Sequence, residues 1–178
     1  MRKDKTIILN SLQEAKEIKE SIITNLNVCV KMLQKEMESD VFDFFKSIKY
    51  EKTVIDPITG ESENLIEVVN QCQTYMVSLM GAEYLFSKFP GVSLQLNLGN
   101  VEGYDIKSVD GSIIAECFAA TSYRSNNKLS DDLKRLSENV TAKNKFEFFY
   151  DKVFSSKNRI YYDKKYPDIT IVKFLDIG

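Results

Sequence analysis

Two acidic residues on neighbouring predicted strands are the clearest candidates for chemistry in this sequence. Asp105 and Glu116 lie in a stretch, Gly99 to Thr121, in which residue character alternates on both sides of Asp110-Gly111. Such alternation is typical of β-strands, and Asp-Gly is a favoured two-residue hairpin turn because both residues tolerate positive φ. In a hairpin the two carboxylates would converge, and together they could hold a hard cation such as Mg²⁺.

Glu116 stands out because its strand is otherwise apolar. Its own face carries Ile114, Phe118 and Ala120, and the opposite face carries mostly small residues that allow a helix to pack closely. Burying an unpaired carboxylate costs several kcal/mol. We therefore expect a cation or hydrogen-bond donors next to Glu116.

A third carboxylate, Glu83, falls on the apolar stripe of a predicted helix. This helix begins after Ser62 or Asn64, runs to about Lys88, and is followed by Pro90-Gly91. A carboxylate on a buried helix face is unusual. Two interpretations stay open: Glu83 points at the site of Asp105 and Glu116, or it lies at the edge of the stripe and reaches solvent or a lysine.

Composition excludes several kinds of chemistry. The chain has 178 residues, 43% of them hydrophobic and 28% charged, and a net charge of −2, which is typical of one globular domain and not of a polycation. It contains no histidine, so Ser-His and Cys-His catalysis and most zinc sites are excluded. Cys29, Cys72 and Cys117 lie in apolar patterns and are expected to be reduced, buried thiols. No apolar run reaches about 18 residues and no signal peptide opens the chain, so we expect a cytoplasmic protein without a membrane span.

The remaining periodicities predict helices first and strands later. The N-terminal third is expected to be one long helix from Ile8 to Met37, either packed on the core or forming the seam of a homodimer. Ser39-Asp40 would end it and cap a shorter helix. The further elements expected are a loop over 51–63, a strand over 92–98, a helix from Lys128 to about Val140 capped by Asn126 or Asn127, and strands at 145–150, 161–162 and 169–174.

The order helix, three antiparallel strands, helix, strand resembles the core of the restriction-endonuclease-like superfamily, the PD-(D/E)XK nucleases. The matching motif residues are Glu83 in A-E-Y-L, Asp105 in G-Y-D-I and Glu116 in A-E-C-F, and the resemblance covers about residues 63 to 150. It implies an α+β fold with a central mixed β-sheet flanked by helices. Residues 1–50 would be an N-terminal helical extension and residues 51–178 the nuclease-like core.

The sequence departs from this family at the motif lysine, because Phe118 stands in its place; Tyr104 also replaces the proline before Asp105. The resemblance implies that Asp105 and Glu116 bind Mg²⁺, that Glu83 assists them, and that an ammonium group orients the attacking water. Lys107 and Lys128 could each supply that charge. We favour Lys128, since some members of the superfamily carry their lysine on the following helix, but both lysines could equally be surface residues.

Basic and polar residues near the predicted site could contact phosphates. They are Arg124, Asn126, Asn127, Lys134 and Arg135, and a second group of lysines, one arginine and tyrosines lies between residues 152 and 166. Such groups are also common on ordinary solvated surface. With the resemblance, they make nucleic acid, and double-stranded DNA in particular, the expected partner.

Three functions are compatible with these residues. The leading one is a Mg²⁺-dependent DNA endonuclease of restriction or defence type, with Asp105, Glu116, Lys128 and Glu83 as catalytic residues. The second is a catalytically inactive nuclease-fold module that binds nucleic acid or a partner protein, which Phe118 and the acidic balance favour. The third is a helical assembly or regulatory protein whose carboxylates pair with lysines.

Overall fold

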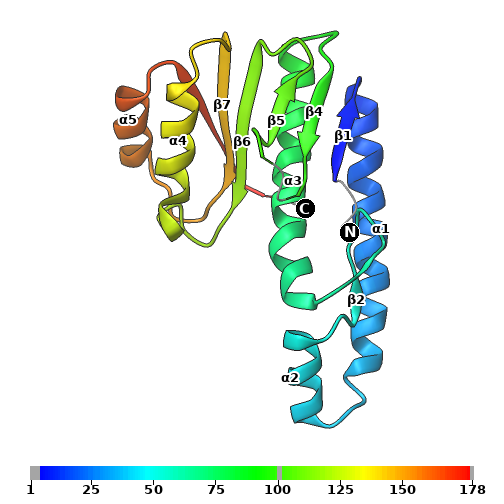
Figure 1. Ribbon diagram of the computed structural model, residues 1–178. Helices are drawn as coiled ribbons and strands as arrows, with labels where there is room; N and C mark the ends of the chain where they lie inside the picture. Colours follow the sequence, from blue (N-terminus) through cyan, green and yellow to red (C-terminus); the bar gives the residue numbers. More distant parts are fainter. Residues whose placement is uncertain (1–4, 100–101, 177–178) are drawn as a thin grey trace.

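A six-stranded mixed β-sheet forms the centre of the computed structural model, which describes residues 5–99 and 102–176 (Figure 1). The strand order is β1-β4-β5-β6-β7-β8; the first three pairings are antiparallel, and β6-β7 and β7-β8 are parallel. The strands are β1 (Thr6–Leu9), β4 (Leu94–Asn97), β5 (Ile106–Ser108), β6 (Ile113–Ala119), β7 (Asn144–Tyr150) and β8 (Ile169–Phe174). The predicted α+β class with a mixed, helix-flanked sheet is confirmed.

Two apolar layers lie on opposite faces of this sheet. On one face, α1 (Leu12–Glu36) and α3 (Leu65–Lys88) cover a cluster that includes Ala115 and Cys117 of β6. On the other face, α4 (Lys128–Glu138) and α5 (Ser156–Lys165) cover a cluster that includes Ile114 and Phe118. The alternation predicted for the Glu116 strand is therefore confirmed, and Glu116 belongs to the face covered by α4.

The N-terminal segment differs from the predicted single helix. Thr6–Leu9 is strand β1, paired with β4, and Ile8 is an exposed strand residue. Ser11 caps α1 by accepting a hydrogen bond from the N–H of Glu14, because a helix start needs an acceptor for its free N–H groups. The β-branched run before Ser11 favours a strand. Residues 1–50 thus contribute an edge strand to the sheet as well as helices.

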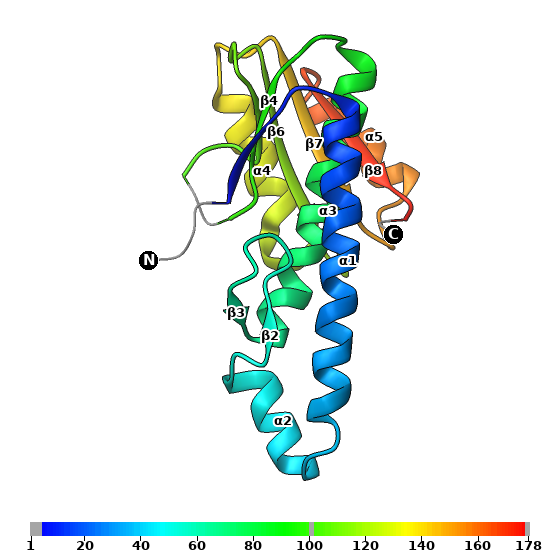
Figure 2. The ribbon, with the colours of Figure 1, turned by 90° about the vertical axis from the view of Figure 1, so that its right-hand side faces the viewer.

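Helix α1 lies along α3 (Figure 2). Its buried residues are Ala15, Ile22 and Cys29. The lower parts of α1 and α3 extend beyond the sheet (Figures 1 and 2). There the chain passes from α1 to α3 through α2 (Val41–Tyr50) and the hairpin of β2 (Val54–Ile55) and β3 (Ser62–Glu63). Asp40 caps α2 and Asn64 caps α3, as predicted. Among the described residues no helix is both long and apolar enough to cross a membrane.

Three smaller predictions were wrong. Tyr161 and Tyr162 lie in helix α5, which Ser155 and Asn158 start with a capping box, so the aromatic pair is not a strand. The segment predicted as a loop over 51–63 contains the β2-β3 hairpin. Cys72 is only partly buried, although Cys29 and Cys117 are buried as expected.

The β5-β6 hairpin is confirmed, but its turn is longer than the predicted two-residue turn. Ser108 and Ile113 flank a loop in which the N–H of Gly111 donates to the carbonyl of Ser108 at 2.8 Å, and Gly111 alone has a positive φ, of 73°. The carboxylate of Asp110 accepts hydrogen bonds from both neighbouring serines, which lowers its pKa to about 2. These bonds stabilise the wider loop. Asn100 and Val101, in the predicted stretch, lie outside the described residues.

Neither Asn126 nor Asn127 caps α4 with its side chain. Both residues adopt left-handed backbone angles, with φ of 52° and 56°, at the end of a short 3₁₀ turn (Ser125–Asn127). Asparagine adopts this conformation more readily than most residues. The pair therefore makes the sharp bend before α4, instead of the predicted cap.

Gly81 lets α3 approach the sheet closely. A Cβ atom at this position would lie 2.8 Å from Cδ2 of Phe148 and 3.2 Å from Cδ1 of Ile106. Both side chains are fully buried and cannot move aside, so we expect Gly81→Ala to lower the free energy of unfolding by about 1–3 kcal/mol, despite the better helix propensity of alanine. Urea denaturation would measure this, with Ser87→Ala on the exposed side of α3 as the control. A Gly81→Ala protein as stable as the wild type would show that α3 can shift freely.

Candidate active site

Asp105 and Glu116 lie side by side on the face of the sheet that α4 covers. Asp105 comes directly before β5, and the pairing of Ile106 with Ala115 places it opposite Glu116 on β6. Its Oδ2 accepts a hydrogen bond from the backbone N–H of Cys117 at 2.7 Å. Asp105 is partly buried, whereas Glu116 is 1% exposed. The hairpin therefore holds two carboxylates side by side on the sheet face beneath α4.

Burial is the main reason that the pKa of Glu116 is raised, to about 8. The charge of Asp105 and a side-chain hydrogen bond with it act in the same direction, and Arg135 opposes them. The Nε of Arg135 lies 2.7 Å from Oε1 of Glu116, but this ion pair lacks hydrogen-bond geometry, so the buried Oε1 has no hydrogen-bond partner. Arg135 thus offsets only part of the cost of burying Glu116.

Helix α4 carries three charged residues toward these carboxylates, at intervals of four and three residues. Lys128 forms an ion pair with Asp132, with 2.7 Å between Nζ and Oδ1, and Arg135 contacts Glu116. Burial opposes the charge of Lys128, but the charge of Asp132, and then those of Asp105 and Glu116, raise its pKa. Lys128 is therefore a stable cation that interacts with both predicted metal ligands. Leu129, Leu133 and Leu136 anchor the helix, as predicted.

Glu147 adds a carboxyl group that the sequence analysis missed. It lies on β7 in parallel register with Glu116, and its side chain is fully buried. Neither of its oxygens has a hydrogen-bond partner among the residues that the structure describes. Burial, followed by the charges of Asp132 and Glu116, raises its pKa well above the usual range. The signal was present, because Glu147 is a lone carboxylate in the apolar run K-F-E-F-F-Y.

We call four carboxyl groups the carboxylate cluster: those of Asp105, Glu116, Asp132 and Glu147. Two of them form ion pairs with cations of α4, Asp132 with Lys128 and Glu116 with Arg135. Burial also raises the pKa of Asp132, against the effect of Lys128, and its Oδ2 has no hydrogen-bond partner. Within the described ranges, no three acidic or cysteine side chains form a ready-made metal site. The cluster is therefore rich in oxygen atoms, several of which accept no hydrogen bond from the described residues. Its side chains are not already arranged as a three-ligand metal site.

Phe118, which stands where the resemblance would place a lysine, is a core residue. It is 4% exposed and stacks on Phe149, with ring centroids 5.2 Å apart and planes 9° from parallel. A lysine at this position would have to leave the apolar layer beneath α4. Strand β6 therefore carries no positive charge, whereas α4 carries Lys128 and Arg135.

Glu83 lies on the opposite side of the sheet from the carboxylate cluster, whereas Lys107 lies on the same sheet face as the cluster but is exposed to solvent. Glu83 forms an ion pair with Lys19 of α1, with 2.8 Å between Nζ and Oε1, on the helical layer of the opposite face. Of the two interpretations left open by the sequence, the structure thus supports the one in which Glu83 lies at the edge of the apolar stripe and reaches a lysine. Lys107 is exposed on β5 and borders a surface pocket with Tyr104 and Asn139.

The predicted nucleic-acid-binding residues separate into two groups. Arg124, Asn126, Asn127 and Lys134 are exposed around α4, and Lys134 forms a long ion pair with Glu138, at 3.9 Å. Arg135 is instead held in place: it contacts Glu116, donates to the carbonyl of Gly103, and has its guanidinium 4.9 Å from the centre of the Tyr104 ring. Arg135 therefore belongs to the site.

Glu116 should make the stability of the protein depend on pH. Its pKa rises from 4.5 to about 8 on folding, so the folded state retains a proton that the unfolded chain has lost, and stability falls as pH rises through that window. Glu116→Gln removes this titration. We expect the variant to match the wild type near pH 4.5 and to exceed its free energy of unfolding by about 4 kcal/mol at pH 8. Urea unfolding at both pH values, with exposed Glu138→Gln as the control, measures this; equal pH dependence in both variants would contradict it.

Searches of protein-family models, of curated proteins and of solved structures find no match to this chain. The arguments about function therefore rest on the site itself.

Proposed function

We propose that this protein is a Mg²⁺-dependent endonuclease that hydrolyses phosphodiester bonds in DNA. The observation that carries the proposal is the meeting of Asp105 and Glu116 on the sheet face that α4 covers, with Lys128 in the first turn of that helix. The charges of both carboxylates also raise the pKa of this lysine. Two carboxylates and one ammonium group are the charges that a metal-assisted nuclease needs. Here the ammonium group comes from α4 and not from the strand.

The residues present fit a hard divalent cation. All the donors are carboxylate oxygens, which Mg²⁺ prefers, and it commonly uses one or two protein carboxylates together with water and phosphate oxygens. The buried Oε1 of Glu116 accepts no hydrogen bond from the described residues, and its ion pair with Arg135 offsets only part of its burial, so a cation would relieve the remaining electrostatic cost. Asp105 and Glu116 are the proposed ligands, and Arg135 would have to release Glu116 or share it.

Each polar residue then has a definite role. A bound Mg²⁺ lowers the pKa of its water and neutralises charge on the phosphate. Lys128 places its ammonium group where negative charge develops on the phosphate, and Asp132 holds that group in position through the 2.7 Å ion pair. Glu147 lies on the strand next to Glu116 and adds a buried acidic group to the site. Glu83 has no part in this proposal, because its ion pair with Lys19 holds it elsewhere.

Double-stranded DNA is the proposed substrate, in keeping with a restriction or defence role. Arg124, Asn127 and Lys134 are exposed near α4 and could contact phosphates on either side of the site. Because the chain carries a net charge of −2, this binding must come from a local surface and should weaken steeply with salt.

The test is a cleavage assay with plasmid, linear and single-stranded DNA and with RNA, in Mg²⁺ or Mn²⁺, at low salt. Wild-type protein should cleave DNA, Asp105→Asn and Glu116→Gln should be inactive, and EDTA should stop the reaction. Glu138→Gln, an exposed carboxylate on the same helix as Lys128, is the matched control and should remain active. If no substrate is cleaved with either ion, the nuclease proposal is refuted.

A second function, an inactive nuclease-like module that binds nucleic acid, is favoured by two specific observations. Arg135 already contacts Glu116, and Phe118 packs in the core where the motif lysine would stand. Such a module would bind DNA equally well in EDTA and in Mg²⁺, and Asp105→Asn would not change its affinity. Those two results, together with no cleavage, would distinguish it from the enzyme.

A further inference from the structure

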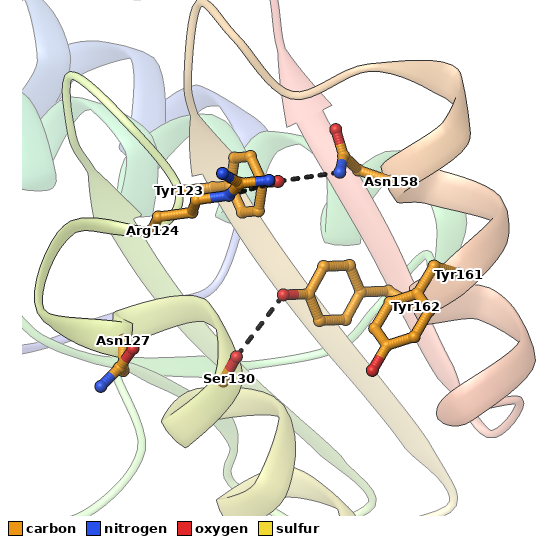
Figure 3. A pocket seen from close by; sticks show the side chains of 7 residues that line it. All are labelled: Tyr123, Arg124, Asn127, Ser130, Asn158, Tyr161 and Tyr162. Carbon is orange, nitrogen blue, oxygen red and sulfur yellow. Dashed lines mark hydrogen bonds between the residues drawn. The ribbon is translucent and has the colours of Figure 1, made fainter.

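A polar pocket opens between the start of α4 and helix α5 (Figure 3). Its volume is about 350 Å³, and its walls are Tyr123, Arg124, Asn127, Ser130, Asn158, Tyr161 and Tyr162. This volume lies at the lower end of the range for small-ligand sites, about 300–1,000 Å³. The pocket could therefore take one monomer unit of a polymer but not a duplex.

The polar side of the pocket is rigid and carries no carboxylate. The hydroxyl of Tyr123 accepts hydrogen bonds from Nε of Arg124 at 2.9 Å and from Nδ2 of Asn158 at 2.8 Å, and the two bonds are drawn in Figure 3. The guanidinium carbon of Arg124 lies 5.3 Å from the centre of the Tyr123 ring. Since a guanidinium group has five N–H donors, the bond from Nε leaves four for a ligand. Among the described residues that line the pocket, Arg124 is thus the one charged side chain, and a positioned cation favours an anion.

The opposite side of the pocket is aromatic. Tyr161 and Tyr162 lie edge to face with centroids 5.0 Å apart, and the hydroxyl of Tyr162 is 3.5 Å from Oγ of Ser130 (Figure 3). Tyr162 also packs against the buried Phe154 and Tyr123, which fixes its ring. Tyr161 is 58% exposed, so one ring is available for stacking.

We propose that this pocket binds one unpaired nucleotide, with its base against Tyr161 and its phosphate at Arg124 and Asn127. The proposal deepens the proposed nuclease function and rests on it for the polymer that supplies the nucleotide. Asn127 directly precedes Lys128, so a phosphate held here is adjacent along α4 to the residue proposed to act on the scissile phosphate. The pocket would hold a nucleotide displaced from the duplex next to the cleavage position.

The test is fluorescence anisotropy of a short fluorescein-labelled single-stranded DNA, in EDTA so that cleavage cannot occur. Tyr161→Ala should weaken binding about tenfold, because stacking on one aromatic ring typically contributes that much. Arg124→Ala should also weaken it and reduce its salt dependence. Tyr50→Ala removes a comparably exposed tyrosine on α2, far from the pocket, and is the matched control. Both tyrosines are exposed, so neither change should affect folding.

Competition identifies the source of the nucleotide. Free nucleoside monophosphate that displaces the labelled strand would show that the pocket takes an isolated nucleotide as well as one within a strand; no displacement, with Tyr161-dependent strand binding, would assign it to strands only. Equal binding by Tyr161→Ala and Tyr50→Ala would overturn the proposal. If the protein cleaves nothing but binding still depends on Tyr161, the pocket proposal stands and the nuclease proposal fails.

Discussion

Lys128→Ala is expected to lower the rate of Mg²⁺-dependent DNA cleavage about a hundred- to a thousandfold and to leave metal binding unchanged. Removing one group that stabilises developing charge typically costs this much, whereas the proposed metal ligands, Asp105 and Glu116, remain. Initial cleavage rates and calorimetric titration with Mn²⁺ would measure the two effects separately. Lys46→Ala, which removes an exposed lysine on α2 that has no part in the proposed site, is the matched control and should cleave almost normally.

The change also leaves Asp132 without its partner, so folding must be monitored by thermal melting. Asp132 is 4% exposed, and an unpaired buried carboxylate is costly. The double variant Lys128→Met with Asp132→Asn removes both charges and keeps the size of the side chains. It should fold and be equally inactive. Normal cleavage by a folded Lys128 variant would refute the assignment and would leave Lys107 as the candidate cation.

Asp56→Ala is expected to lower the free energy of unfolding by about 3–5 kcal/mol, the usual cost of removing one partner of a buried ion pair. Asp56 is 2% exposed, and its Oδ2 lies 2.6 Å from Nζ of Lys5 and 3.2 Å from the hydroxyl of Tyr75. Its Oδ1 accepts hydrogen bonds from the N–H groups of Ile58 and Thr59. One carboxylate thus joins the segment before β1, the β2-β3 turn and helix α3.

Acid should weaken this contribution. Burial raises the pKa of Asp56, but its bonds to Lys5 and to the turn outweigh burial and hold the pKa below the usual 3.8. A depressed carboxyl pKa gives stability that is complete above pH 3.8 and is lost as pH falls through the folded-state value. The difference between wild type and Asp56→Ala in urea unfolding should therefore shrink in strong acid. Asp163→Ala, which breaks the exposed pair with Arg159, is the control and should cost less than about 1 kcal/mol; an Asp56→Ala effect of the same size would contradict the prediction.

The local parts of the site could be read from the sequence. Alternation around Asp110-Gly111 predicts the hairpin that places Asp105 beside Glu116, and the leucine spacing of α4 predicts which face of this helix meets the sheet. Both patterns follow from periods of two and 3.6 residues within one element. They are reliable because burial on one face selects them directly.

The parts that were missed depend on pairing between distant segments. Glu147 joins the site because β7 lies parallel to β6 in a register that aligns it with Glu116, and no local period specifies that register. Ile8 fits both the α1 stripe and a short strand, and pairing with β4 decides between them. Tyr161-Tyr162 has the composition of a strand, but the capping box of Ser155 and Asn158 starts a helix there.

The central claim is that Asp105 and Glu116 hold a divalent cation, and calorimetric titration of Mn²⁺ into the wild-type protein tests it most directly. The site predicts saturable binding of one ion, which Asp105→Asn and Glu116→Gln each abolish and which the control Glu138→Gln leaves unchanged. No Mn²⁺ binding by the wild-type protein, or binding that survives in the Asp105→Asn, Glu116→Gln double variant, would contradict the claim.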